Sequence, residues 1–271
     1  MDSFFFIPGN KLDKINFVTS LEVTEVIIDL EDAIKYSERE PVLERLLQDK
    51  DLQGFYIRVP LYDNRGYINT AILEKLIHSG FKKYVFPKIN SLNDFEKISV
   101  VFQRVDIKII LLVETPLFFF EVREVLSKYK GLFTGIGIGS HDFMSIIGGV
   151  HTLDNINYIR QNILYLARAY GISAIDIASM ELKDEVGFKD EIIDGFKKGY
   201  DAKFFIHPWQ FTVYKGVRFY DEKDYNWALK VNEAFSQSGH DDEFNPVMID
   251  GQVIERPHLN KMKQILKHYK K

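Results

Sequence analysis

Short apolar runs recur along the chain, and longer amphipathic segments lie between them. Eight of these runs have the length of a β-strand, and they start about 20 to 40 residues apart, which is the length of a strand-helix-strand unit. The predicted strands start at Phe4, Glu25, Gly54, Lys83, Lys108, Gly135, Ala174 and Lys203. Most of them are apolar throughout rather than alternating, so we expect strands that are buried on both faces, as in a parallel sheet.

The segments between the strands have the pattern of helices that end at glycine. Residues 70–80 place Leu73 and Leu76 on one stripe, and the apolar repeat of residues 155–171 stops at Gly171. Eight strand-helix units predict an α/β fold, a (β/α)8 TIM barrel. An open, doubly wound sheet is the alternative, but no glycine-rich dinucleotide fingerprint follows the first predicted strand.

The predicted barrel covers residues 1–220, and residues 221–271 are expected to form a C-terminal extension with helices and a hairpin. In this extension Asp250 and Gly251 have the character of a two-residue turn that joins the runs "PVMI" and "QVIE". No repeat, low-complexity tract or linker divides the first 220 residues.

Composition narrows the classes of function. Of the 271 residues, 46% are hydrophobic and 27% are charged, and the net charge of -4 argues against a nucleic-acid partner. The chain has no cysteine, which excludes thiolate chemistry and fits a cytoplasmic location. No apolar run approaches the roughly 20 residues of a membrane-spanning helix, so no membrane partner is expected.

Charged residues stand at the ends of the predicted strands, where barrel enzymes place their chemistry. They are Asp29, Glu31, Asp32, Arg58, Lys88, Glu114, Asp142, Asp176 and His207. A single carboxylate at such a position is most often a helix N-cap, so only the residues taken together indicate a functional site. His207 is expected to cap or pack beside Pro208, and the direction of His141 is open between the barrel mouth and the following helix.

Carboxylates that converge on one mouth would repel each other unless a divalent cation lay between them. Mg²⁺ needs one or two protein carboxylates together with waters and substrate oxygens, and Glu114 and Asp142 are the best pair of ligands. The residues expected to hold the waters of this ion as a second shell are Asp29, Glu31 and Asp32. Arg58 carries a planar fork that suits a substrate carboxylate.

The sequence resembles a known family in eight motifs that occur in the family's order. They are "FFIPGNKLDKI", "EVIIDLEDAI", "YIRVP", "YVFPKI", "LLVETP", "GIGIGSHDF", "ARAYGISAID" and "FFIHPWQ". The chain is identified on them as similar to the citrate lyase β-subunit-like proteins of the HpcH/HpaI aldolase family, within the phosphoenolpyruvate/pyruvate superfamily. The resemblance covers nearly the whole chain.

The resemblance implies a (β/α)8 barrel that assembles as a homotrimer or a dimer of trimers. It implies a Mg²⁺-dependent carbon-carbon lyase or aldolase that acts through a metal-stabilised enolate, with Mg²⁺ held by Glu114 and Asp142. The substrate would be a small keto or hydroxy acid or its acyl-CoA thioester. The predicted substrate-binding residues are Arg58, Lys88, Gly139 and Ser140, and the predicted catalytic residues are Arg58, Asp29 and Glu255.

The family's C-terminal segment lies over the active site of a neighbouring subunit and brings an aspartate there. Two alignments of this chain compete for that position, one with Asp250 and one with Glu255. We prefer Glu255, because Asp250 falls in the predicted hairpin turn. The side chain of Glu255 is one methylene longer than that of the family's aspartate, which could displace a general acid or base by about 1 Å.

Other departures from the family indicate a diverged paralogue. Lys11 and Lys14 replace arginines near the start, and His141 replaces an acidic residue. The run "LFFF" at residues 117–120 is expected to pack in a helix but could narrow a coenzyme A channel. A thioester hydrolase on the same site, or a non-catalytic metabolite-binding paralogue in a biosynthetic cluster, therefore remain alternatives.

Overall fold

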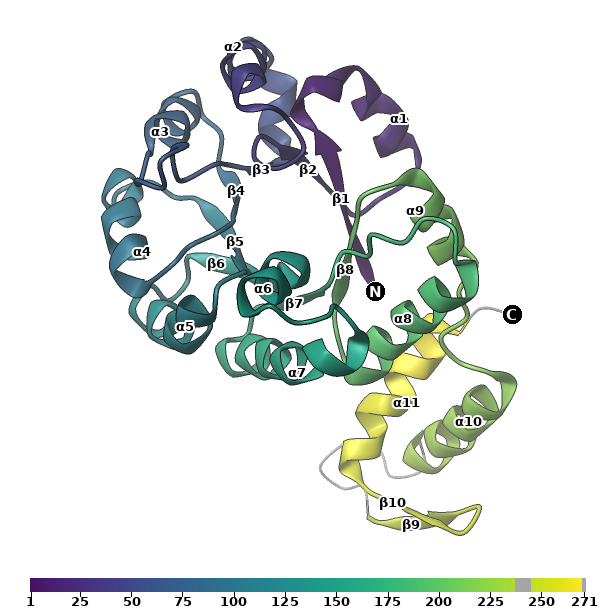
Figure 1. The fold of residues 1–271 in the computed structure, drawn as a ribbon. Coiled ribbons are helices and arrows are strands. Elements are labelled where there is room, and N and C mark those ends of the chain that lie inside the picture. The colour runs from purple at the N-terminus through teal and green to yellow at the C-terminus, as the bar shows by residue number, and fades with distance from the viewer. Residues whose placement is uncertain (237–244, 270–271) are drawn as a thin grey trace. The chain divides into compact units, whose positions relative to one another are not determined.

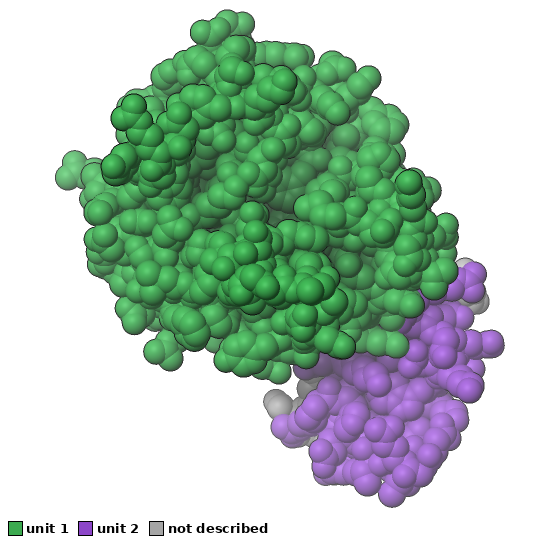
Figure 2. Space-filling view, viewed as in Figure 1, with its two compact units in different colours: residues 1–215 green, residues 216–271 purple. Residues whose placement is uncertain are grey.

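The computed structural model describes residues 1–236 and 245–269, so residues 237–244 and 270–271 of the predicted extension lie outside the described residues. The chain divides into two compact units, residues 1–215 and residues 216–271 (Figure 2). The larger unit contains the barrel and the smaller unit contains the hairpin.

Eight parallel strands form a closed barrel in chain order, with helices arranged around it (Figure 1). This confirms the predicted (β/α)8 fold and excludes the open sheet. The strands are β1 (Asp2–Pro8), β2 (Glu25–Asp29), β3 (Tyr56–Arg58), β4 (Lys83–Phe86), β5 (Lys108–Val113), β6 (Phe133–Ile138), β7 (Ser173–Asp176) and β8 (Ala202–Phe205). Phe4 in β1 pairs with Glu25 in β2 on one side and with Phe204 in β8 on the other, which closes the ring.

The helices of the barrel unit follow the strands. They are α1 (Ile15–Ser20), α2 (Arg39–Gln48), α3 (Ala71–His78), α4 (Leu92–Ser99), α5 (Pro116–Lys128), α6 (Ser140–Ile147), α7 (Leu153–Tyr170), α8 (Glu185–Lys198) and α9 (Pro208–Lys215). Short 3-10 helices occupy Gly9–Lys14, Tyr36–Glu38, Lys50–Gly54 and Val100–Phe102. Helix α7 ends at Gly171 with a φ of 65°, the left-handed conformation that glycine adopts without strain.

Buried apolar side chains fill the interior of the barrel. They are Phe4, Phe6, Ile27, Tyr56, Val85, Ile110, Leu112, Ile175, Ala202 and Phe204. Gly137 in β6 makes room for this packing, because a β-carbon there would lie 2.7 Å from Cε2 of Phe204. The glycines of "GIGIG" therefore serve close packing, and the interior is a core rather than a channel.

The run at residues 117–120 falls in α5 and is only partly a packing element. Phe118 is fully buried, as predicted, whereas Phe120 is 75% exposed. Phe119 lies between them in edge-to-face contact with Phe143 and Tyr158. This links α5 to α6 and α7.

The smaller unit contains α10 (Glu222–Ser236), an antiparallel hairpin of β9 (Val247–Ile249) and β10 (Gln252–Ile254), and α11 (Arg256–His268). The hairpin turn predicted at Asp250 and Gly251 is confirmed, since their φ values are 49° and 79°. The unit has its own apolar core, which includes Ala228, Val231, Ile254 and Ile265. Among the described residues, no helix is both long and apolar enough to cross a membrane.

Candidate active site

Seven charged side chains come from the carboxyl ends of five neighbouring strands of the barrel. They are Asp29, Glu31 and Asp32 from β2 and its loop, Arg58 from β3, Lys88 after β4, Glu114 after β5 and Asp142 after β6. All seven are among the nine strand-end residues predicted from the sequence. Hydrogen bonds and ion pairs link several of these side chains to one another.

Arg58 is held by Asp29, which lies beside it in the sheet. Arg58 Nε donates to Oδ1 at 2.8 Å and Nη2 donates to Oδ2 at 2.5 Å, so one edge of the guanidinium is fully engaged. The carboxylate of Asp29 also accepts the backbone N–H groups of Glu31 and Ala33 at 2.9 and 3.2 Å. Phe6 supports the guanidinium from below, with the ring centroid 5.0 Å away.

This geometry favours a positioning role for Asp29 over the catalytic role predicted from the sequence. Its carboxylate is 1% exposed, and both oxygens already accept hydrogen bonds from Arg58 and from the loop that follows β2. Such a group orients its neighbours and has no free lone pair aimed at a substrate. In this structure Asp29 holds the guanidinium of Arg58 in place.

Lys88 bridges the acidic pair Glu31 and Asp32. Its Nζ lies 2.7 Å from Glu31 Oε1 and 2.5 Å from Asp32 Oδ1. The backbone of Lys88 has a φ of 53°, a region that non-glycine residues rarely occupy. In this conformation its N–H donates to Glu114 Oε2 at 2.6 Å, so one residue contacts three carboxylates. Strained backbone of this kind concentrates at functional sites.

Glu114 lies at the end of β5, where "ETP" turns the chain into α5. Thr115 is the N-cap of the helix and Pro116 occupies its first turn, so the motif ends the strand and starts the helix at once. Glu114 is 1% exposed. Gly139 lies against it, because a β-carbon at position 139 would overlap Cγ and Oε1 of Glu114.

Burial raises the pKa of two carboxyl groups in this cluster. The pKa of Glu114 is raised to about 8, because burial and the nearby charges of Asp142 and Glu31 outweigh the attraction of Arg58. Burial likewise raises the pKa of Glu31 to about 7, and a hydrogen bond with Asp32 adds to the effect. Burial also opposes ionisation of Asp32, but hydrogen bonds to Glu31 and Lys88 lower its pKa.

The donor set fits a hard divalent cation. Five carboxylates face only two cationic side chains, Arg58 and Lys88, and Glu31 Oε2 is buried without a hydrogen-bond partner. The cluster offers oxygen ligands alone, as Mg²⁺ prefers. In the described part of the chain, no group of three acidic or histidine side chains could hold a metal by itself. A site of two carboxylates completed by waters and substrate remains compatible with the cluster.

Helix α6 carries the other predicted residues of the turn after β6. Asp142 is half-buried in its first turn, and its charge is close enough to raise the pKa of Glu114. Ser140 is buried, and its Oγ lies 2.9 Å from His151 Nε2. The N–H of Gly139 donates to Val113 O at 3.1 Å. The substrate-binding roles predicted for Ser140 and Gly139 thus compete with contacts inside the protein.

The histidines and Asp176 lie outside the charged group described above. His141 stacks on His151 with ring centroids 3.8 Å apart, so it contacts the segment before α7. His207 caps α9 as predicted, since its Nδ1 accepts the N–H of Trp209 at 3.1 Å. Asp176 is fully buried and pairs with Arg160 of α7 at 2.7 Å, so its place among the strand-end residues was misleading.

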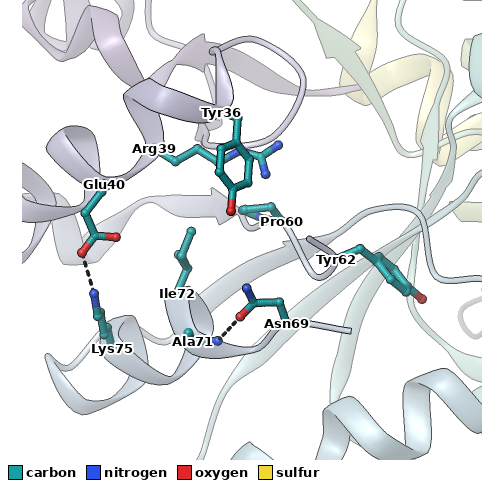
Figure 3. Close-up of a pocket in the computed structure, with 9 residues that line it drawn as sticks. All are labelled: Tyr36, Arg39, Glu40, Pro60, Tyr62, Asn69, Ala71, Ile72 and Lys75. Carbon is teal, nitrogen blue, oxygen red and sulfur yellow. Dashed lines mark hydrogen bonds and ion pairs between the residues drawn. The ribbon is translucent and has the colours of Figure 1, made fainter. Parts of the chain in front are cut away.

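Arg39, which was not among the residues predicted from the sequence, lines two cavities beside the cluster. The larger cavity, of about 330 Å³, also contacts Glu31 and Lys88. The smaller one, of about 180 Å³, lies between Tyr36 and Arg39 on one side and α3 on the other (Figure 3). The sequence did contain one unusual feature. Arg39 lies in the first turn of α2, where a positive charge opposes the helix dipole. We call the two cavities together the Arg39 groove.

In the smaller unit, the two candidates for the family's C-terminal acid have different surroundings. Both oxygens of Asp250 lie close to Lys230 Nζ, at 2.8 and 2.6 Å. The Glu255 side chain is exposed, and its residue precedes α11 as the N-cap. Asp250 thus pairs with Lys230 of α10, whereas the exposed Glu255 has no ion-pair partner among the described residues and forms a capping box with His258 at the start of α11.

Comparison with known proteins agrees with the sequence motifs. The sequence pattern of the family described as HpcH/HpaI aldolase/citrate lyase matches residues 2–208. A (3S)-malyl-CoA thioesterase of Cereibacter sphaeroides is 24% identical over 97% of this chain and 93% of its own length. The mitochondrial citramalyl-CoA lyase of Homo sapiens is 25% identical over 86% of this chain and 75% of its own length.

A solved structure has the same fold. The CitE protein of Mycobacterium tuberculosis, crystallised with magnesium, acetoacetate and coenzyme A, superposes with a TM-score of 0.81. The superposition covers 98% of this chain and 97% of that chain at 22% sequence identity.

Proposed function

Because the chain belongs to the HpcH/HpaI aldolase/citrate lyase family, we propose that it is a Mg²⁺-dependent carbon-carbon lyase or aldolase. Its substrate would be a small keto or hydroxy acid, free or as the acyl-CoA thioester. The names of the relatives support this substrate class, since one is a citramalyl-CoA lyase and one structure holds acetoacetate and coenzyme A.

The observation that carries the proposal is the surplus of buried negative charge at the barrel mouth. The pKa values of Glu31 and Glu114 are raised to about 7 and about 8, so the cluster resists full ionisation by itself. A cation supplied from solution would relieve this repulsion. Structural ion pairs elsewhere in the barrel, such as Arg160 with Asp176, contain their own cation.

We assign Glu114 and Asp142 as the residues that would hold Mg²⁺, with Glu31 and Asp32 holding its waters. When bound, the ion would stabilise negative charge that develops on the carbonyl oxygen of the reacting group. Gly139 leaves the space in which Glu114 can lie. The N–H of Lys88 fixes Oε2 of that glutamate, which leaves Oε1 for a ligand.

Arg58 would bind the substrate carboxylate through the side of the guanidinium that Asp29 does not use. Nη1 lies 3.8 Å from Glu31 Oε2 and 3.7 Å from Asp32 Oδ2, beyond hydrogen-bond distance, so its N–H groups can donate to an incoming carboxylate. Asp29 keeps the plane of the fork fixed. Lys88 would contact the substrate only after it loosens from the acidic pair.

Cleavage of a hydroxy acid thioester requires a group that moves a proton. The hydroxyl loses a proton, the carbon-carbon bond breaks, and the departing fragment takes up a proton at carbon. We propose Glu255 of a neighbouring copy for this role, in a cytoplasmic homotrimer or dimer of trimers. The exposure of Glu255 and the Lys230 partner of Asp250 favour this choice of acid.

Thioester hydrolysis is the second candidate, and the name of the (3S)-malyl-CoA thioesterase favours it. The same arginine and cation would position the acyl group, with water as the attacking species. The products separate the two reactions. A lyase releases a keto acid and an acetyl thioester, whereas a hydrolase releases the hydroxy acid and the free thiol.

Turnover assays with Mg²⁺ test the proposal. The panel contains coenzyme A thioesters of malate, citramalate and citrate, with products identified by mass spectrometry. We expect Glu114→Gln to lower turnover by about a hundredfold or more, because it removes charge at the reacting centre. Glu124→Gln, an exposed position on the following helix, is the matched control and should match the wild type.

The same assay distinguishes the two C-terminal acids. Glu255→Gln should lower turnover without weakening Mg²⁺ binding, whereas Asp250→Asn should leave turnover near the wild-type rate. A saturable acid-binding signal without turnover on the whole panel would instead favour a metabolite-binding paralogue.

A further inference from the structure

Arg39 stands apart from the other arginines of the barrel unit that are at least partly buried. Arg58 binds Asp29, and Arg160 binds Asp176 and Asp194. Arg39 is half-buried, yet it forms no ion pair with any carboxylate in the described part of the chain. A guanidinium that is partly removed from water without a counter-charge keeps its charge available to an anion from solution.

The contacts of Arg39 hold its side chain in place and leave most of its donors free. Nη2 donates to the backbone oxygen of Glu31 at 3.3 Å, and the guanidinium carbon lies 5.2 Å from the centre of the Tyr36 ring. Nε is buried without a hydrogen-bond partner. A guanidinium has five N–H donors, so a single hydrogen bond leaves most of the fork available.

The Arg39 groove connects this guanidinium to the candidate active site. Both of its cavities are lined by Tyr36, Arg39, Pro60 and Tyr62, and the larger one also reaches Glu31 and Lys88. Its volume of about 330 Å³ lies in the range of small-molecule sites, roughly 300 to 1,000 Å³. A ligand at the acidic cluster can therefore extend towards Arg39.

The other charged groups of the groove have partners of their own. Lys75 pairs with Glu40 at 2.6 Å at one end of the smaller cavity (Figure 3). Asp63 lines the larger cavity, but its Oδ1 accepts the N–H groups of Arg65 and Tyr67. Arg39 is thus the charged group of the groove that is left to select an anion.

We propose that Arg39 binds a second carboxylate of the substrate, at the end remote from the reacting carbon. The inference rests on the proposed function and names its substrate class: keto or hydroxy acids that keep two free carboxylates, one at Arg58 and one at Arg39. The planar fork of a guanidinium matches a carboxylate in two parallel hydrogen bonds. A phosphate on a carrier arm shares this anionic chemistry and is a separate arm of the test.

Malate and lactate are the probes, because they share a 2-hydroxy acid and differ by one carboxylate. Isothermal titration with Mg²⁺ present measures both affinities in the wild type and in Arg39→Gln. We expect the wild type to bind malate at least about tenfold more tightly than lactate, since hydrogen bonds to charged groups contribute this much. Arg39→Gln should remove that preference and leave the lactate affinity unchanged. Arg39→Lys should restore only part of the preference, because it keeps the charge without the fork.

Arg45→Gln is the matched control, since Arg45 lies exposed on the same helix and should not affect either ligand. A wild type that binds lactate but shows no preference for malate would overturn the inference and leave the proposed function intact. A wild type that binds neither acid would overturn both. An equal loss of affinity for malate and lactate in Arg39→Gln would also overturn the inference, because Arg39 would then act only by holding the loop at Glu31 in place. If Arg39→Gln weakens only pantetheine 4′-phosphate, relative to pantetheine, the anion is a phosphate and the carboxylate assignment is wrong.

Discussion

Glu114 owes its place in the cluster to the absence of a side chain at Gly139. The carboxylate fills the space in which a β-carbon would stand, and its other contact is the N–H of Lys88. The position of Glu114 thus depends on a glycine at position 139 and on the strained backbone of Lys88, whose N–H group and not its charged side chain contacts the carboxylate.

Gly139→Ala should therefore displace Glu114 while leaving the barrel folded. We expect Mg²⁺ affinity, measured by isothermal titration, to fall by about tenfold or more. A displacement of a functional group by about 1 Å is enough to cost this much. Gly54→Ala is the control, since a β-carbon at Gly54 meets no atom within 4 Å. Unchanged Mg²⁺ binding in Gly139→Ala would show that Glu114 is not a ligand.

Helices α7 and α8 are joined to β7 by a buried ion pair. Arg160 and Asp176 are both fully buried, and Asp194 of α8 contacts the same guanidinium at 2.7 Å. Gly195 lies so close that a β-carbon there would overlap Asp176 Oδ2. Asp176, which was predicted to lie near the barrel mouth, thus helps to hold α7 and α8 against β7.

Arg160→Leu should destabilise the protein by about 3 to 5 kcal/mol, because it leaves Asp176 buried without its partner. Chemical denaturation measures the change in the free energy of unfolding. Arg168→Leu tests an exposed pair on the same helix, whose side chains are 49% and 38% exposed, and should cost less than about 1 kcal/mol. Similar losses in the two variants would contradict the importance of burial.

The same elements explain how far the sequence could predict the structure. All eight strands were predicted from the sequence, because a strand that is buried on both faces has a continuous apolar run. β3 begins at Tyr56 rather than Gly54, because Lys50–Gly54 forms a 3-10 helix. The charged cluster was predictable from strand ends alone, whereas the outward direction of Asp176 depends on which face of the sheet a residue occupies.

Arg39 could not be assigned to a site from sequence alone. Its groove combines the segment before α2 with the loop after β3, and only the closed barrel brings these segments together. Whether an arginine is already paired depends on which carboxylates lie beside it in the folded protein, and the sequence alone does not show this. The same limit applied to Asp29, whose carboxylate looked free until its hydrogen bonds were known.

For the molecule as a whole, the cluster should make stability fall as the pH rises. Unfolded glutamates ionise near pH 4.5, whereas Glu31 and Glu114 in the folded protein have pKa values of about 7 and about 8. Between these pH values the folded state binds more protons than the unfolded state, so the free energy of unfolding decreases with rising pH. The slope is on the order of 1 kcal/mol per pH unit for each group.

Denaturation of the metal-free protein from roughly pH 5 to pH 8 checks this slope. Glu114→Gln should reduce it, because a glutamine binds no proton in either state. Added Mg²⁺ should raise the stability most at the upper end of the range, where the carboxylates are free to bind it. A slope that is identical in the wild type and Glu114→Gln would contradict the raised pKa of Glu114.

The contact between Gly137 and Phe204 has a consequence for how this lineage can diverge. The two positions share one volume inside the barrel, since any side chain on Gly137 would enter the space of the Phe204 ring. A larger residue at position 137 therefore requires a smaller one at position 204. Among distantly related sequences, residues at positions 137 and 204 should therefore co-vary, and a large residue at both positions should be rare.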